Sequence, residues 1–230
     1  MMAVVVPAAP LAEAEVVALQ IEVPLVEVRR YLGYPRGRRP SAVVAARLDE
    51  LRPLGVSLLR PRGALRLTPG AALAGSGMPR PVEEVAVGVC TIGPELEQES
   101  VRRGESDDPL GALILDAIGS AAAEASAEAL AAHVCAAAAA RGLRATRRIS
   151  PGYGRWPVSA QTTLLALLPC RELGITLSPG LMMTPRKSVS FAARLRPGGE
   201  DRPAPSRPPC AACRQEPCPY RRTKAHQGDS

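Results

Sequence analysis

Two segments, RRISPGYGRWP at residues 147–157 and LMMTPRKSVSF at residues 181–191, decide how we interpret this chain. Within seven residues, the first segment places the guanidinium of Arg148, the stiff Pro151, two glycines and the ring of Tyr153. Glycines let backbone N–H groups approach a ligand closely, and an arginine fork can pair bidentately with a carboxylate. This combination suits a small zwitterionic molecule. Pro-Gly pairs also mark ordinary surface turns, and from these residues alone the turn is the simpler interpretation.

The composition is that of a globular protein with a basic end. The chain has 230 residues, of which 46% are apolar and only 3% aromatic, so one sizeable domain with extra ends, or two small ones, must pack mainly Leu, Val, Ile and Ala. The formal net charge is +7, and residues 186–224 alone carry ten Lys and Arg against three acidic residues. A basic segment can bind nucleic acid, an acidic protein or nothing. Because aromatics are not interleaved with the charges, we do not expect nucleic acid as a partner.

The N-terminal stretch does not have the pattern of a targeting signal. It is apolar, but it lacks a basic start, is interrupted by Pro7 and Pro10, and carries Glu13 and Glu15. No uncharged run reaches the ~20 residues that a membrane-spanning helix needs. We therefore expect a soluble, cytoplasmic protein without a membrane partner, whose six cysteines are thiols or ligands rather than disulfides.

Three regions are expected: a low-complexity leader at 1–23, a folded domain at 24–196, and a Pro-rich linker with a Cys-containing basic tail at 197–230. Periodicity and capping residues predict the elements of the domain. The expected helices cover 26–32, 42–51 with Ser41 as cap, 94–103, 107–141 and 158–175, and the expected strands cover 64–68, 83–93, 175–180 and 187–195. A small-residue linker is expected at 70–80.

The longest expected helix carries two carboxylates on one face. Glu124 and Glu128 are one turn apart, and small residues dominate the second half of the helix, so another element can pack closely against it. Without further context, two solvated carboxylates are the simpler interpretation.

Six segments, taken in order, resemble the activation (reactivation) domain of cobalamin-dependent methionine synthase in a free-standing form. The segments are RRYLGY at 29–34, VCTIGPELE at 89–97, LDAIGSAAAEASAEAL at 115–130, RISPGYG at 148–154, LGITLSPGLMMTPRKSVS at 173–190 and the tail pattern CxxCxxxxCPYRR. Each segment alone is a weak signal, but six in the right order are a strong one. Together they cover most of residues 24–222.

The resemblance implies an α+β fold, a twisted antiparallel β-sheet with flanking helices, that binds S-adenosylmethionine. In that family the domain docks over a corrinoid whose cobalt has oxidised to Co(II) and presents the methyl group, while a donor such as flavodoxin or ferredoxin supplies one electron. The implied partner is a corrinoid-binding methyltransferase or methionine synthase modules carrying cobalamin. The resemblance requires no acid, base or nucleophile from this chain. The alternative is a non-catalytic module that binds S-adenosylmethionine or a corrinoid protein.

Carried over by position, the resemblance places Glu124, Arg148, Ser150, Gly152 and Tyr153 at the ligand. The chemistry agrees, because an arginine suits the ligand's carboxylate and a glutamate suits its ammonium group or ribose hydroxyls. Two departures stand out. In the synthase-fused domain, an aromatic-rich segment that adds a tyrosine to the pocket follows the SVS motif, whereas here two alanines and an arginine follow Phe191. An acidic residue from the family's N-terminal part has no identifiable counterpart.

The tail has ligand-like cysteine spacing. Cys210, Cys213 and Cys218 offer three thiolates, and His226 or a partner residue would complete a zinc site or the ligand set of an iron–sulfur cluster. A flexible tail with free thiols explains the same residues, and both interpretations stay open. The other three cysteines, at 90, 135 and 170, lie in apolar segments and are expected in the core.

Overall fold

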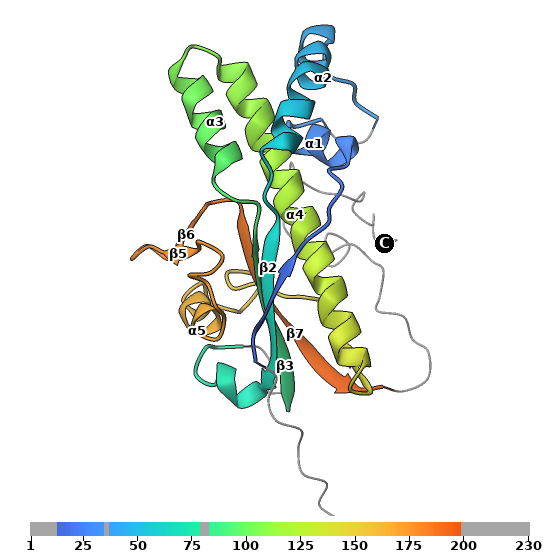
Figure 1. Cartoon of the computed structure of the whole chain (residues 1–230), viewed down its shortest axis with the longest axis vertical. Helices are drawn as coiled ribbons and strands as arrows, with labels where there is room; N and C mark the ends of the chain where they lie inside the picture. The colour runs from blue at the N-terminus through green and yellow to red at the C-terminus, as the bar shows by residue number, and fades with distance from the viewer. Residues whose placement is uncertain (1–12, 35–36, 79–82, 199–230) are drawn as a thin grey trace, which may run out of the picture.

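A five-stranded antiparallel sheet forms one half of the structure, a computed structural model that describes residues 13–34, 37–78 and 83–198 (Figure 1). The strand order is β1-β2-β3-β7-β4. The two longest pairings join β3 to β2 and to β7. The strands are β1 (Glu15–Ala18), β2 (Arg62–Pro69), β3 (Glu84–Thr91), β4 (Leu143–Ala145) and β7 (Ser188–Pro197). The predicted α+β class with a twisted antiparallel sheet is confirmed.

Strand β3 lies at the centre of the sheet because both of its faces are apolar. Val85, Val87 and Val89 point into one core layer, while Cys90 belongs to the layer on the opposite face. Gly88 also helps helix α4 to approach the sheet, since a Cβ there would lie only 3.1 Å from a methyl group of Leu130. The small residue therefore sets how close helix and sheet can come.

Helix α4 (Pro109–Ala139) runs the length of the molecule, from the helical end to the far edge of the sheet (Figure 1). Its start follows from the sequence: Asp108 caps it by accepting a 2.9 Å hydrogen bond from the Gly111 N–H, and Pro109 occupies the first turn. Among the described residues it is the one helix long and apolar enough to cross a membrane. However, 61% of its most apolar window is buried inside the structure, as in the core helix of a soluble protein.

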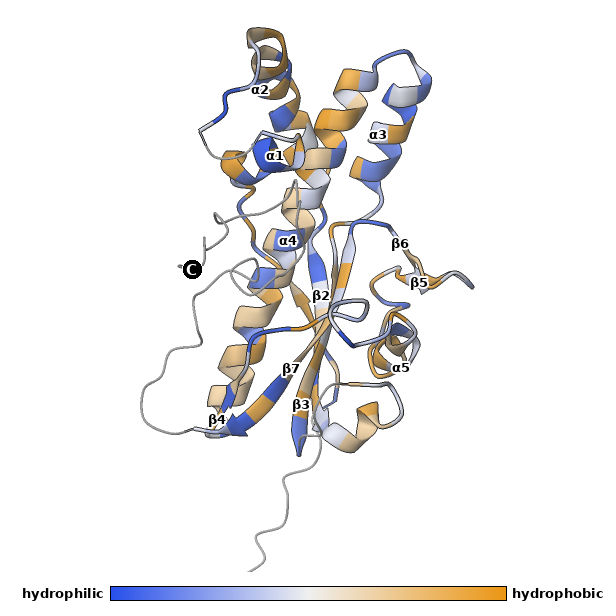
Figure 2. Cartoon of the chain, turned by 180° about the vertical axis from the view of Figure 1, so that it is seen from behind, coloured by the Kyte–Doolittle hydropathy of each residue, from blue (hydrophilic) through white to orange (hydrophobic). Residues whose placement is uncertain are grey.

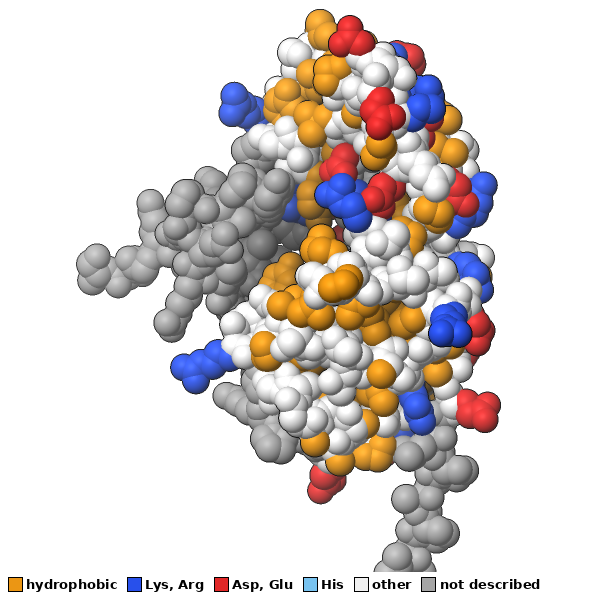
Figure 3. All heavy atoms as spheres, turned by 90° about the vertical axis from the view of Figure 1, so that its left-hand side faces the viewer, with side chains coloured by type: hydrophobic (Ala, Val, Ile, Leu, Met, Phe, Trp, Pro, Cys, Tyr) orange, Lys and Arg blue, Asp and Glu red, His pale blue; other side chains and the backbone are white. Residues whose placement is uncertain are grey.

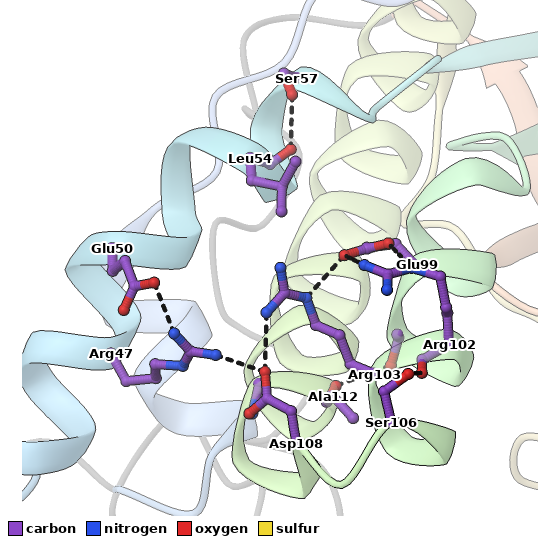
Figure 4. A network of polar contacts seen from close by, with 12 residues as sticks. Arg47, Glu50, Leu54, Ser57, Glu99, Arg102, Arg103, Ser106, Asp108 and Ala112 are labelled. Atoms are coloured by element: carbon purple, nitrogen blue, oxygen red, sulfur yellow. Dashed lines mark hydrogen bonds and ion pairs between the residues drawn. The ribbon is translucent and has the colours of Figure 1, made fainter.

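Three further helices pack around the first half of α4: α1 (Leu25–Tyr31), α2 (Ala42–Ser57) and α3 (Glu95–Glu105). Asp108, the N-cap of α4, joins this helix to α2 and α3, because its Oδ2 pairs with Arg47 of α2 at 2.5 Å and with Arg103 of α3 at 2.8 Å (Figure 4). The Gly111 N–H, followed by Arg103 and Arg47, holds the pKa of the Asp108 carboxyl below its ordinary value. This network fixes the helical end of the molecule.

The opposite face of the sheet is covered by α5 (Ala160–Ala166) and the hairpin of β5 (Thr176–Leu177) and β6 (Met183–Thr184). Trp156 is 2% exposed in this layer, and its indole Nε1 donates a 3.2 Å hydrogen bond to the Ser76 carbonyl. A buried indole needs such an acceptor. The tryptophan thus ties residues 147–157 to the segment after η1 (Gly70–Leu73).

The structure corrects the predicted start of the folded domain. Strand β1 lies inside the expected leader at 1–23, with Val16 opposite Ala64 in the sheet, and Leu19 and Val23 are buried. The sequence around β1 looked too simple to fold, but burial against β2 stabilises it. Likewise, the expected linker at 70–80 contains η1 and the buried Leu73.

Two predicted helix ends are wrong. Helix α2 continues past Pro53 to Ser57, because its later turns pack on α4: a Cβ at Gly55 would contact Ile118. This burial offsets the backbone hydrogen bond that Pro53 cannot donate. In contrast, α5 ends at Ala166 rather than near residue 175, since the chain turns around Pro169 before β5.

Candidate functional site

The structure brings two of the predicted ligand-binding residues, Glu124 and Arg148, into direct contact. The Arg148 Nη2 donates to the Glu124 Oε1 across the space between α4 and the segment that follows β4. The two side chains are 19% and 24% exposed, so the pair is largely shielded from water but still reachable. The Arg148 guanidinium also lies 6.0 Å from the centre of the Phe191 ring.

The backbone holds Arg148 in this position. After β4, the chain continues along β7: the Thr146 N–H donates to the Arg194 carbonyl at 2.8 Å, and Ile149 and Ala192 exchange two hydrogen bonds of 2.8 Å. Because side chains alternate along an extended segment, Ile149 packs into the α5 layer while Arg148 points to α4. The connection from β4 to α5 then crosses from one side of the sheet to the other (Figure 2).

The turn beyond Arg148 has the geometry that its glycines predict. Gly152 and Gly154 have φ angles of +88° and +61°, where glycine is favoured, and the Gly152 N–H donates to the Trp156 carbonyl at 2.9 Å. Ser150 accepts at its carbonyl from the Tyr153 N–H. The Tyr153 side chain is 76% exposed, so its ring stands at the surface beside the turn.

A second ion pair on the same face of α4 was not predicted. The Lys187 Nζ lies 2.7 Å from the Asp116 Oδ1 and donates to the Ser120 Oγ at 2.8 Å. Asp116, Ser120 and Glu124 recur every four residues and form one polar row along the helix. The spacing of this row is visible in the sequence, but its partner Lys187, which directly precedes β7, could not be identified there.

Cys90, whose thiol is influenced by the charges of Arg148 and Glu124, is fully buried, as predicted. Burial raises the pKa of its thiol to about 12, with the positive charge of Arg148 opposing that rise. Cys135 was expected in the core as well, but it is exposed, because it lies on the outer side of the last turns of α4. Cys170 is half-buried.

The described residues contain no group of three or more His, Cys, Asp and Glu side chains that could hold a metal ion. The predicted metal ligands Cys210, Cys213 and Cys218 lie outside the part of the chain that the structure describes.

A mostly apolar groove of about 350 Å³ lies away from this site, between α3 and residues 184–185. One exposed face of α3 lines it, including Val101. On the side of the molecule that carries α3 and α5, hydrophobic side chains gather below a group of charged ones (Figure 3). None of the five predicted ligand-binding residues lines the groove.

Comparison with known proteins defines the class of this fold. No known family profile matches the sequence, and no curated protein matches it. Among solved structures, the chain is similar to the crystal structure of the MetH reactivation domain bound to AdoHcy, with a TM-score of 0.59, 19% sequence identity, and coverage of 85% of this chain and 82% of that one. The fold is therefore of the methionine synthase reactivation-domain type, and the resemblance is confirmed at this level.

Proposed function

We propose that this chain is an S-adenosylmethionine-binding module that supports reductive methylation of the cobalamin of a methionine synthase or related corrinoid methyltransferase. The observation that carries the proposal is the meeting of Glu124 and Arg148, from α4 and from the RISPGYG turn, in a fold whose solved relative binds AdoHcy. An acid and an arginine side by side offer complementary charges to an amino-acid head group.

The other residues suit the rest of such a ligand. The space beside Gly152 leaves room for an adenine edge to approach the turn, since a Cβ there would find no atom closer than 3.9 Å. Ser150 and Tyr153 flank that turn, and the exposed Tyr153 ring is available to stack on the ligand or on the partner protein.

The chemistry follows from the ligand and the cobalt. A donor such as flavodoxin or ferredoxin supplies one electron, which converts Co(II) to Co(I). The electron pair of Co(I) would then form a bond to the methyl carbon as the carbon–sulfur bond breaks, and the sulfur would keep the electron pair of the broken bond as the thioether of S-adenosylhomocysteine. The chain itself positions the sulfonium and excludes water, so we assign it no acid, base or nucleophile. We place the protein in the cytoplasm, where such a system operates.

We also propose that Cys210, Cys213 and Cys218 hold zinc or an iron–sulfur cluster, which in the second case would deliver the electron. Metal analysis of the anaerobically purified chain tests this directly. If the purified protein contains neither iron nor zinc, this proposal is refuted.

A second candidate is a module that binds the ligand or a corrinoid protein without supporting methyl transfer. Phe191, which resemblance places near the pocket wall, is fully buried, and the small Ala192 and Ala193 follow it. That strand therefore adds no aromatic ring to a pocket surface.

Calorimetric titration with S-adenosylmethionine tests the proposal, with Arg148→Ala and Glu124→Ala as variants. Each change should weaken binding by about 1–3 kcal/mol, the range for a lost charged hydrogen bond. Glu128→Ala is the matched control, because it removes the same charge one turn away. A methylation assay with a corrinoid protein and a reductant then separates the two candidates. No binding by the folded wild type would contradict both.

A further inference from the structure

We infer that the groove between α3 and residues 184–185 binds the basic, tyrosine-containing end of this chain's own tail, residues 217–224. The groove lies within the described structure, whereas the tail segment lies outside the residues that the structure describes. The inference goes beyond the proposed function and is independent of it, because no small-molecule ligand enters the argument.

The groove has the form of a site that exists before its occupant arrives. Its volume is about 350 Å³, its lining is mostly apolar, and the 52% exposed side chain of Val101 lines it. Contacts hold both of its sides in place. The Glu97 carboxylate of α3 accepts a 2.8 Å hydrogen bond from the Arg186 N–H, and the Lys187 ammonium binds α4. An apolar hollow between fixed walls can accept a side chain without the cost of rearrangement.

The rim of the groove is acidic, although the chain as a whole has a net charge of +7. Helix α3 carries four glutamates against two arginines. Arg102 lines the groove, but Glu99 compensates its charge through two hydrogen bonds of 2.7 Å. Glu97 and the exposed Glu105 therefore give the groove a negative charge. The Arg186 guanidinium offsets this charge only weakly, because it is 65% exposed and lies 4.0 Å from Glu97.

Residues 217–224, PCPYRRTK, match both properties of the groove. Tyr220 supplies an aromatic side chain for the apolar hollow, and aromatic anchors of this kind carry much of the binding energy of peptides and proteins. Arg221, Arg222 and Lys224 supply positive charge, and the segment contains no acidic residue. The two prolines that precede the tyrosine restrict the backbone, which lowers the entropy lost when an extended peptide binds.

The chain between the sheet and this segment is long enough to reach the groove. Strand β7 leads away from α3 to the opposite end of the molecule (Figure 1), and its ten residues span about 30 Å at the rise of an extended strand. Residues 199–216 follow, and 18 residues of Pro-rich chain span about 55 Å. A tethered segment that can reach its site has an effective concentration on the order of millimolar, so weak contacts are sufficient to fill the groove.

Photo-crosslinking on the full chain tests the inference. A benzophenone amino acid replaces the exposed Gln98, which lines the groove, and in a control chain it replaces Val43, which is 71% exposed on α2. After irradiation, peptide mapping by mass spectrometry locates the attachment point. Position 98 should crosslink to residues 217–224 within one chain, at least about fivefold more than position 43 does. The reaction does not involve thiols, so it gives the same information whether or not the tail cysteines hold a metal.

Variants separate the two parts of the recognition. Tyr220→Ala should lower the yield of the position-98 crosslink several-fold, and Tyr220→Phe should retain it, because the ring fills the hollow. Glu105→Lys should lower the yield about fivefold, since it replaces attraction by repulsion. Asp49→Lys is the matched control: it makes the same charge change at an exposed position on α2 and should leave the yield unchanged. Circular dichroism establishes that each variant is folded.

Three outcomes would overturn the inference. The first is a position-98 yield no higher than that of position 43. The second is a crosslink to residues 217–224 found only in dimers, which would assign the groove to the tail of a second copy. The third is a yield that neither Tyr220→Ala nor Glu105→Lys changes, which would show that proximity alone produces the crosslink. None of these outcomes bears on S-adenosylmethionine binding, so the proposed function is judged separately by its own titration.

Discussion

Replacing Gly88 with alanine should destabilise the protein through the ring that supports Arg148. An added Cβ would lie 2.8 Å from the Phe191 Cζ and 3.1 Å from a methyl group of Leu130, and both of these side chains are fully buried. Overpacking of this kind costs about 1–3 kcal/mol. Alanine also restricts the unfolded chain more than glycine does, and this effect offsets up to about 1 kcal/mol of that cost. We therefore expect a net loss of about 1–2 kcal/mol in the free energy of unfolding.

Equilibrium denaturation in urea measures this loss, and Trp156, the single tryptophan of the chain, supplies a buried fluorescence signal. Gly104→Ala is the control, because the nearest atom to a Cβ there is 3.7 Å away and the site lies near the exposed end of α3. That change should be neutral or stabilising by up to about 1 kcal/mol.

A double variant shows whether the ring is the cause. Phe191→Leu alone should destabilise by leaving a cavity, but combined with Gly88→Ala it should cost less than the sum of the two single changes. If Gly88→Ala is as stable as the wild type, or if the two changes add without coupling, the proposed contact between strand β3 and the Phe191 ring does not limit the packing. Affinity for the proposed ligand should fall in Gly88→Ala as well, because the ring that lies 6.0 Å from the Arg148 guanidinium must shift.

Three other changes test the remaining interactions. Asp108→Asn keeps a helix cap but removes a carboxylate whose pKa is lowered in the fold, so the wild type should be more stable at pH 7. Acid denaturation curves should show this advantage disappearing as the pH falls through the pKa of the folded protein, which lies below the ordinary 3.8. A constant difference in stability down to pH 2 would contradict the assignment. Lys187→Met removes the ammonium that joins Asp116 and Ser120 while keeping the aliphatic stem. Since Asp116 is half exposed, we expect urea denaturation to show a loss of about 1 kcal/mol in the free energy of unfolding. An unchanged midpoint would mean that the pair contributes nothing to stability. Iodoacetamide at pH 8 should alkylate the exposed Cys135 but not Cys90, whose thiol has a pKa of about 12, and rapid labelling of Cys90 in peptide maps of the native protein would overturn its placement.

Local chemistry made part of the fold predictable. The Asp108–Pro109 pair marks the start of α4 in the sequence, and its capping bond is present. The alternation of valines with small residues identified β3. Element ends were less predictable, because distant packing decides them: α2 continues past Pro53 since α4 covers its last turns, and β1 forms only because β2 lies beside it.

The arrangement of the candidate site was predictable only in part. Resemblance placed Glu124 and Arg148 in one region, and the structure brings them into contact. Their mutual ion pair was not foreseen, because 24 positions separate them and no periodicity links a helix to a turn. The contact of Lys187 with the polar row of α4 was not predictable for the same reason, since it depends on how β7 lies against the helix.

The pairing of β3 with β7 also determines when the site can form during folding. Thr91 lies opposite Ser188, so the central ladder of the sheet closes a loop that contains all of α3, α4 and α5. Closing such a long loop carries a large entropic cost and slows folding relative to local contacts. Helix α4 can form early, but Arg148 acquires its support only when β7 has joined the sheet, because Phe191 lies on that strand. On a ribosome, the proposed ligand site would thus be among the last features of the domain to form.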